Sequence, residues 1–405
     1  MSMDSESEEI LPSALGAQER ERATGLASYI SFQPGDTLKD GRYRPFRKLG
    51  EGNFASVWLA RDTLLDRYVA IKIGLAWRLQ AQDRELSLLR QLKDRPIPSH
   101  PGERHVEALL DDFHHEAQNV THPCLVFKPF GRDLDGLVAG FRMDRHQPYP
   151  FARKVCIQAL LAVNYLHQQN IMHGNIQAHN LLLDLTYDID KESEDEIRAK
   201  NTKGNELNEP DEPFPLDDRT LISATSPTNA RAVLVDLGCA STPANAWSNR
   251  YGYPVPYRAP EVVVRGDVNY RADIWALGCL VFQIITGAPL FVIEGWGDPD
   301  QTNIEHMYAF IEMLGPLPKS LRDFWSAADE HVNIEGELLR PFPEDERTLP
   351  LTGSIREESP EGMSQEEVSA FAEFMAMMIC FDPEERALTE TLLQHRWVTE
   401  FAVDR

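Results

Sequence analysis

The chain has 405 residues, of which 42% are hydrophobic, and it has a formal net charge of −24. This length and hydrophobic content allow one large enzyme or two packed lobes, with a sizeable core. The negative charge argues against nucleic acid or an anionic membrane as a partner, because long-range repulsion opposes the encounter, and it favours basic peptides. The five cysteines have no paired spacing, so the sequence predicts neither a disulfide framework nor a zinc site.

The amino terminus is rich in serine and glutamate. Its first ten residues, MSMDSESEEI, lack the basic and apolar runs of a secretory signal, so we expect a cytoplasmic or nuclear protein. Residues 1–35 show little hydrophobic periodicity, which predicts a disordered acidic tail. The stretch Ile274–Ile293 is apolar enough to suggest a membrane span, but Gly287 and Pro289 interrupt it. A helix buried inside a large domain has the same composition, and we therefore expect a soluble chain.

The first ordered region is rich in β-prone segments. Between Tyr43 and about Lys72, short β-prone runs alternate with turns, which predicts an antiparallel sheet. Residues 78–92 place leucines at helical spacing beside charged neighbours and predict an amphipathic helix. The run PCLVFKPFG, residues 123–131, predicts a buried strand that leads into a linker.

The pattern changes to longer helices from about Phe151 onward, where apolar residues recur every three or four positions. A mostly β lobe therefore precedes a mostly α lobe, and the predicted fold class is α+β. Residues 185–218 form an acidic segment that we interpret as a surface insert, too polar to order itself by burial. We find no internal repeat.

A glycine-rich motif and a lysine indicate a phosphate site. Gly50 and Gly52 in GEGNFASV lie between two predicted strands, where the absent side chains would let the backbone approach a polyphosphate. Alone this signal is weak, since such hairpins are often only turns and the third glycine of the usual pattern is Ala55. Lys72, in the strand VAIK, has a point charge that could hold phosphate oxygens, although a lone strand lysine is usually solvated.

Acidic and amide side chains farther along could complete the site. Glu85 on the amphipathic helix could orient Lys72; Glu116 is a second candidate, but order and spacing favour Glu85. Asn180 in HGNIQAHNLLL and Asp236 in VLVDLG each lie beside a β-prone run. Their side-chain oxygens are ligands of the type that Mg²⁺ accepts.

With these elements in this order, the chain resembles the eukaryotic protein kinase family from about Tyr43 to Trp397. The resemblance implies a two-lobed kinase fold, with an N-terminal antiparallel sheet lobe that carries one main helix and a mainly α-helical C-terminal lobe. It implies a kinase domain at residues 43–400, with the N-lobe at about 43–127, the hinge at about 128–131 and the C-lobe at about 132–400. The implied cofactors are ATP and Mg²⁺, with Asn180 and Asp236 as metal ligands. The implied nucleotide-binding residues are Gly50, Gly52, Val57, Ala70, Lys72, Glu85 and Phe127.

Motifs of the second half extend the resemblance. In YRAPEV, Glu261 is expected to pair with Arg386 of the second lobe. Asp273 of DIWALG resembles the family's buried aspartate that caps the backbone of the catalytic loop, which assigns the apolar stretch that follows to a core helix. YRAPEV, DLG in place of DFG, and HMYAFIEMLGPLP resemble SR-protein kinases and their fungal relatives.

The catalytic loop departs from the family pattern at three positions that engage the substrate hydroxyl. HGN stands in place of HRD, so Asn175 replaces the catalytic aspartate, Gln177 replaces a lysine, and Pro254 replaces a threonine that touches both. Asparagine cannot accept a proton as a carboxylate does, and general-base help is worth about 10²- to 10⁴-fold in rate. Gly174 replaces the arginine that usually binds an activation-loop phosphate, so activation by loop phosphorylation is not expected.

Three functions remain open at this point. The first is a Ser/Thr protein kinase with impaired transfer, acting on a protein or peptide substrate that is basic or rich in Arg and Ser. The second is a nucleotide-binding pseudokinase that serves as a scaffold or regulator. The third is a small-molecule phosphotransferase, because HGNIQAHN also resembles the HGDxxxxN loop of such enzymes; YRAPEV, DIWALG and Arg386 argue against it. The oligomeric state stays open.

Overall fold

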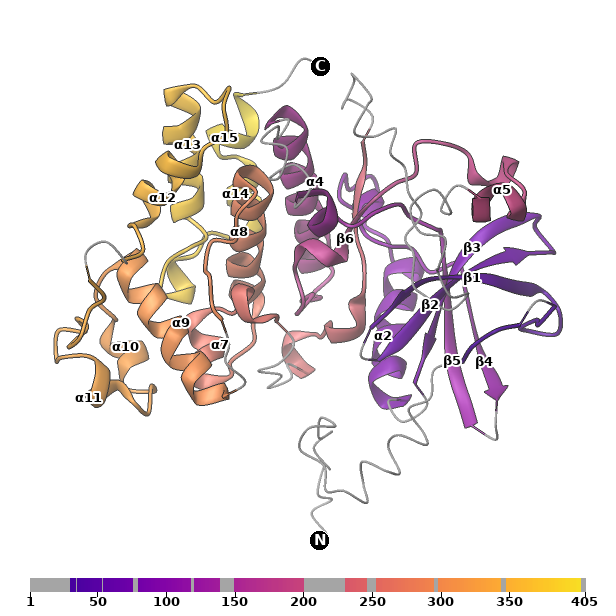
Figure 1. Cartoon of the computed structure of the whole chain (residues 1–405), viewed down its shortest axis with the longest axis horizontal. Coiled ribbons are helices and arrows are strands. Elements are labelled where there is room, and N and C mark those ends of the chain that lie inside the picture. The colour runs from indigo at the N-terminus through magenta and orange to yellow at the C-terminus, as the bar shows by residue number, and fades with distance from the viewer. Residues whose placement is uncertain are drawn as a thin grey trace, which may run out of the picture. The chain divides into compact units, whose positions relative to one another are not determined.

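The computed structural model describes residues 30–33, 35–52, 54–75, 79–117, 120–138, 149–199, 230–245, 253–294, 298–343 and 347–401. Most of the predicted acidic tail and residues 200–218 of the predicted insert lie outside these ranges. The chain forms two compact units, each of which can be followed in Figure 1. The first unit comprises Met1–Leu86, Leu109–Pro129 and Asp188–Leu216, and the second comprises Ser87–Ala108, Phe130–Tyr187 and Asp217–Arg405.

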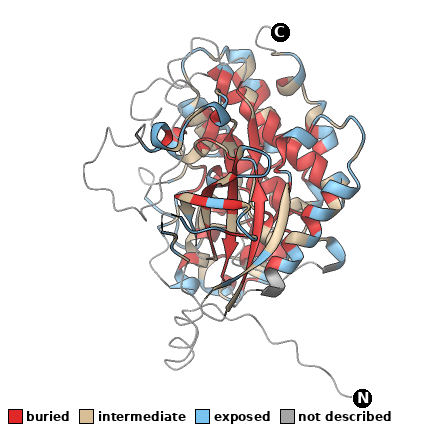
Figure 2. Ribbon diagram, turned by 90° about the vertical axis from the view of Figure 1, so that its right-hand side faces the viewer, coloured by how far each residue is buried: buried red, intermediate tan, exposed pale blue. Residues whose placement is uncertain are grey.

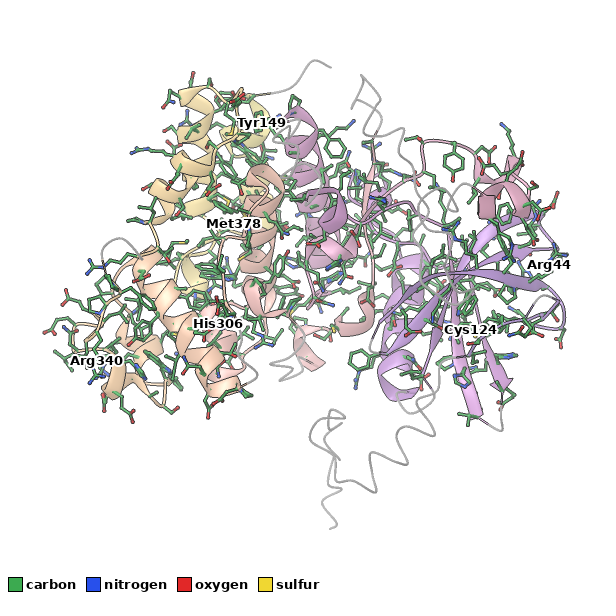
Figure 3. The ribbon with its side chains drawn as sticks, in the orientation of Figure 1. Arg44, Cys124, Tyr149, His306, Arg340 and Met378 are labelled. Atoms are coloured by element: carbon green, nitrogen blue, oxygen red, sulfur yellow. The ribbon has the colours of Figure 1, made fainter. Side chains whose placement is uncertain are left out.

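The first unit is built on a five-stranded antiparallel sheet with the strand order β1-β2-β3-β5-β4. The strands alternate buried side chains between the two faces, and one face carries a hydrophobic cluster that includes Trp58, Ile71 and Cys124, the last labelled in Figure 3. Phe32, from the segment before β1, packs against this cluster. The strands are β1 (Tyr43–Glu51), β2 (Ala55–Asp62), β3 (Arg67–Gly74), β4 (Asp111–Ala117) and β5 (Val120–Phe127).

The predicted amphipathic helix is α2 (Leu79–Asp94), and the unit boundary falls within it. Hydrogen bonds tie its carboxyl end to the second unit: Gln91 Nε2 donates to Gln169 O at 2.9 Å, and Gln169 Nε2 donates to Arg95 O at 2.6 Å. Residues 87–108 therefore group with the second unit, although the sequence placed them within one N-terminal lobe.

Part of the acidic insert is ordered, contrary to the expectation from its polarity. The segment Asp188–Ala199, which includes α5 (Glu194–Ala199), belongs to the first unit. Two isoleucines, Ile189 and Ile197, are buried, and Arg44 of β1 pairs with Glu194 at 2.5 Å (Figure 3). Buried apolar side chains and polar contacts, among them the 2.6 Å hydrogen bond from Tyr68 N to Asp190, together dock this mostly charged segment against the sheet.

The second unit is mainly helical, with α4 and α8 in its core. Thirteen of the 17 residues of α8 are buried. Figure 2 colours the described residues by burial, with buried residues in red. A small antiparallel sheet pairs β6 (Leu181–Leu183) with β7 (Ala232–Leu234). The helices are α4 (Tyr149–Gln168), α7 (Pro260–Arg265), α8 (Tyr270–Thr286), α9 (Pro299–Leu314), α10 (Lys319–Arg322), α11 (Ala328–His331), α12 (Leu351–Glu358), α13 (Gln365–Ala376), α14 (Thr389–Leu393) and α15 (Arg396–Thr399).

The apolar stretch that begins at Ile274 is explained by burial. Trp275 of α8 stacks on Phe291, with 5.5 Å between ring centroids, and Phe310 of α9 meets Trp275 edge to face. Within the described ranges, no helix has the length and apolar character needed to cross a bilayer. The predicted α+β class, an antiparallel sheet with one main helix followed by a mainly helical region, is confirmed.

Candidate active site

One face of the first unit's sheet carries the predicted nucleotide-binding residues side by side. Strand pairing places Gly50 opposite Val57, Val57 opposite Lys72, and Ala70 opposite Phe127. Directly opposed residues point to the same face, and Ala70 lies two residues before Lys72 on β3. All five therefore share one face, while the hydrophobic cluster described above fills the other.

Lys72 is fixed on that face by an ion pair. Its Nζ lies 2.6 Å from Oε1 of Glu85 on α2, and the Glu85 side chain is only 2% exposed. Glu116, the other candidate partner, lies on β4 and accepts a hydrogen bond from Thr121 at 2.5 Å. The pairing of Lys72 with Glu85 that order and spacing favour is therefore present, and it orients the ammonium group.

Gly50 and Gly52 are not required by the torsions or the packing of the chain itself. Neither has a positive φ, and a Cβ built on either one meets no atom within 4 Å. Gly52 N donates to Ala55 O at 2.9 Å across the turn between β1 and β2. Bare backbone beside open space suits the close approach of a polyphosphate, so these residues fit the phosphates of ATP.

In the second unit, the loop His173–Asn180 is held by Asp273 of α8. The buried carboxylate of Asp273 accepts hydrogen bonds from His173 N at 2.8 Å, Gly174 N at 2.9 Å and His167 Nε2 at 3.0 Å. Burial alone would raise the pKa of Asp273, but the hydrogen bond from His167 and the electrostatic interactions with His167 and His173 lower it below its usual value. The backbone cap predicted for Asp273 is present.

Gly174 is required by the shape of this loop. Its φ is +73°, and a Cβ at this position would lie 2.5 Å from the carbonyl oxygen of Cys239. An L side chain would be strained here by both torsion and contact. The glycine at this position therefore allows a close approach between the loop and the segment after β7.

Asn175 and Gln177 form an amide pair. Gln177 Nε2 donates to Asn175 Oδ1 at 2.8 Å, so the asparagine oxygen is already engaged. Burial lowers the pKa of the neighbouring His173. The pair has neither the carboxylate that would take a proton nor the cation that would steady a phosphoryl group.

The two predicted metal ligands are brought together by the small sheet. Val235 N donates to Asn180 O at 2.9 Å, which places Asp236 beside Asn180. Asn180 Nδ2 donates to Asn175 O at 2.9 Å, so its Oδ1 is the atom that can ligate a cation. A carboxylate beside an amide oxygen is a donor set that fits Mg²⁺, which would neutralise charge on the phosphates of a bound nucleotide.

The segment around Pro254 contacts the loop His173–Asn180 through Tyr257. Pro254 O accepts a hydrogen bond from Tyr257 N at 2.9 Å, and the Tyr257 hydroxyl accepts one from Ala178 N of the loop at 3.4 Å. Glu261 and Arg386 form the predicted pair through two hydrogen bonds, of 2.6 and 2.7 Å, with both side chains almost fully buried.

The comparison with known families identifies the fold. The protein kinase domain family matches residues 43–398, which is most of the chain. The chain belongs to the protein kinase family. The two-lobed kinase fold inferred from the motifs is thereby confirmed.

Curated relatives place this kinase with the SR-protein-kinase-like group. Serine/threonine-protein kinase SRPK of Physarum polycephalum is 27% identical over 92% of this chain and 89% of its own length. Protein kinase dsk1 of Schizosaccharomyces pombe is 24% identical over 92% of this chain and 84% of its own length. Serine/threonine-protein kinase SKY1 of Saccharomyces cerevisiae is 33% identical over 37% of this chain and 21% of its own length.

Two residues that contact Asp273 and Asp236, namely Tyr253 and Glu107, could not be identified from the sequence. The buried Tyr253 donates its hydroxyl hydrogen bond to Asp273 at 2.7 Å, and Glu107 Oε1 accepts one from Asp236 N at 2.6 Å. The partners are 20 and 129 positions apart, and neither residue falls in a motif with known spacing. Only the folded backbone brings them to the loop and to the metal-ligand candidate.

Proposed function

We propose that this chain binds ATP and Mg²⁺ and that its transfer of phosphate to Ser or Thr of protein substrates is impaired. Support for nucleotide binding comes from the first unit, where Lys72 is paired with Glu85 and the backbone at Gly50 and Gly52 is open. Support for metal binding comes from the second unit, where the small sheet brings Asn180 beside Asp236.

The impairment rests on one observation, the amide pair of Asn175 and Gln177. Phosphoryl transfer relies mostly on positioning and on charge stabilisation by metal and lysine, and a general base adds about 10²- to 10⁴-fold. Loss of the carboxylate therefore slows the reaction and leaves a residual rate. Loss of the loop cation removes a further stabilising charge.

The substrate class we propose is a basic or Arg/Ser-rich polypeptide. The net charge of −24 attracts basic segments and opposes nucleic acid and anionic membranes. The relative named SRPK is a serine/threonine-protein kinase, which favours a hydroxyl acceptor on protein here too. We place the protein in the cytoplasm or nucleus, where its cysteines, all free in the structure, would stay reduced.

A second candidate function, a nucleotide-loaded scaffold without transfer, is favoured by the same amide pair together with Pro254. All three family groups that engage the acceptor hydroxyl are replaced, while the contacts that build the fold are kept. A small-molecule phosphotransferase is disfavoured, because the segment around Glu261 and Arg386 belongs to kinases that bind polypeptides.

The first test is thermal stabilisation by ATP. Binding to the folded state alone raises stability by about 2.7 kcal/mol when ligand exceeds Kd a hundredfold. We expect a clear rise in Tm with ATP and a larger one with Mg²⁺. No rise under either condition would remove the proposed nucleotide site.

The second test is transfer of labelled phosphate from ATP to an Arg/Ser-rich peptide. Wild type is compared with the double variant Asn175→Asp, Gln177→Lys and with Lys72→Met as the blank. We expect slow transfer by wild type and a gain of about 100-fold or more in the double variant, as a general base returns. Wild type equal to the blank, with activity only in the double variant, would favour the scaffold.

A further inference from the structure

The segment between α2 and β4 runs alongside β7 in the second unit. Glu107 N donates to Leu234 O at 3.0 Å, and Val106 forms a parallel bridge with the same strand residue. His105, also buried, makes a 2.8 Å contact between its Nδ1 and Ala232 O. Residues 105–107 therefore lie along β7 and are joined to it by one isolated parallel bridge at Val106.

The side chain of Glu107 continues this contact beyond the end of the strand. Its Oε1 accepts a hydrogen bond from Asp236 N at 2.6 Å, and the residue is only 8% exposed. Backbone and side chain of one residue thus hold Leu234 and Asp236, two positions apart. A short hydrogen bond to a carboxylate in a buried setting is among the strong kind.

Asp236 adopts a conformation that needs such support. Its φ is +67°, in the left-handed region that non-glycine residues rarely occupy. Its own Oδ1 accepts a hydrogen bond from Gly238 N at 3.3 Å, which is a long contact. A strained backbone of this kind persists when its surroundings determine it, and the Glu107 carboxylate accepts the Asp236 amide hydrogen bond at 2.6 Å.

We propose that Glu107 is a positioning residue for the metal ligand Asp236. By accepting the Asp236 N–H, its carboxylate holds the left-handed backbone and so aims the Asp236 side chain at the divalent cation that accompanies ATP. The role rests on the proposed Mg²⁺–ATP binding and adds to it the group that orients one ligand. Outer-shell partners of this kind typically change metal affinity by about 10- to 100-fold when they are removed.

Hydrogen exchange tests the contact without any nucleotide. In the wild-type protein, the Asp236 amide should exchange slowly, at least tenfold slower than an exposed loop amide. Glu107→Met, which keeps the length and removes the acceptor, should lose this protection, whereas Glu107→Gln keeps an oxygen acceptor and should retain it. Glu103→Met, at an exposed glutamate of the same segment, is the matched control and should behave as wild type.

Magnesium titration at a fixed ATP concentration, followed by thermal stabilisation, tests the role in metal binding. Glu107→Met should need about 10- to 100-fold more Mg²⁺ for half its stabilisation, with the effect of ATP alone unchanged. Glu107→Gln should stay near wild type. Equal weakening in both variants would overturn the role of the hydrogen-bond acceptor, and wild-type behaviour of Glu107→Met would overturn the role of Glu107 altogether.

The two failures can be told apart. No nucleotide response in the wild-type protein would remove the proposed function and the metal role with it, while the exchange data would still show whether Glu107 holds Asp236. If Glu107→Met does not fold, the wild-type amide decides: slow exchange at Asp236 supports the contact, and fast exchange overturns it.

Discussion

Two side-chain pairs, one in each unit, have nearly the same length and very different chemistry. Lys72 and Glu85 of the first unit meet at 2.6 Å as an ammonium and a carboxylate, whereas Asn175 and Gln177 of the second unit meet at 2.8 Å as two neutral amides. Two neutral amides can therefore lie at nearly the same distance as an ammonium and a carboxylate. What each pair can do for a phosphate or a hydroxyl depends on its charge, and only the first pair is made of charged groups.

The framework around the amide pair is nevertheless built from charged groups. Asp273 holds the backbone of the loop, and Glu261 is paired with Arg386 in an almost fully buried ion pair. Removing one partner of such a pair leaves a buried charge uncompensated, which is costly whether or not the protein transfers phosphate. In this unit, the charged groups that hold the fold together are therefore distinct from the groups that would take part in phosphoryl transfer.

Removing the positive charge of Lys72 from the first pair should have the largest effect. Lys72→Met should abolish stabilisation by ATP and lower the free energy of unfolding by about 3–5 kcal/mol, because Glu85 is buried and loses its cation. Denaturant unfolding with and without ATP measures both effects. Lys319→Met, at a lysine side chain that is 80% exposed, is the control and should change neither. A Lys72→Met protein that still responds to ATP would contradict the assigned role.

The docked insert separates the stability of the first unit from its nucleotide chemistry. Ile197→Ala should lower the free energy of unfolding by about 2–4 kcal/mol, because a buried side chain is truncated, while ATP still stabilises the folded protein. Ile334→Ala, at an isoleucine that is 75% exposed, is the matched control. Denaturant unfolding that is unchanged in Ile197→Ala would show that the segment Asp188–Ala199 contributes no stability.

Sequence patterns predict some of these elements and contacts and miss others. The sheet, α2, the core helix at Asp273 and the pairs Lys72–Glu85 and Glu261–Arg386 all follow from local periodicity or from motifs of fixed spacing. The docking of Ile197 does not, because its segment is too polar to predict burial and its partner surface comes from distant strands. Glu107 and Tyr253 are hidden for the same reason, since each acts through one long-range hydrogen bond.

Gly50 of the first unit and Gly174 of the second unit are expected to differ in what requires a glycine at each position. Gly174→Ala should lower the free energy of unfolding by about 1–3 kcal/mol, since a Cβ at positive φ would meet the Cys239 carbonyl. Gly50→Ala should leave stability within about 0.5 kcal/mol, because its Cβ meets nothing, yet weaken stabilisation by ATP. Denaturant unfolding and the ATP-induced change in Tm distinguish the two. A large stability loss in Gly50→Ala would mean that packing, and not a ligand, requires this glycine.

The smallest expected effect concerns the positive charge that His179, in the loop His173–Asn180, gains on protonation. His179 lies 3.2 Å from Asp133 and 3.4 Å from Asp135. The hydrogen bond to Asp133 raises the pKa of His179, and so do the negative charges of both aspartates, although burial lowers it. A raised pKa in the folded state gives stability that is fully present below the unfolded value of about 6.5 and is lost as pH rises through the folded value. The side chain is 61% exposed, so solvent screening limits the effect to less than about 1 kcal/mol.

The measurement is the difference in free energy of unfolding between wild type and His179→Gln across this pH range. We expect wild type to be favoured more at about pH 5.5 than at about pH 8.5, and added salt should shrink the difference. In a background of Asp133→Asn and Asp135→Asn, the same substitution should show no such pH dependence, because the partners that raise the pKa of His179 are gone. A difference that grows as pH rises would mean that burial, and not the two aspartates, dominates at His179. His179 would then be less protonated near neutral pH than a free histidine side chain, and the loop would contrast more with the charged pair of the first unit.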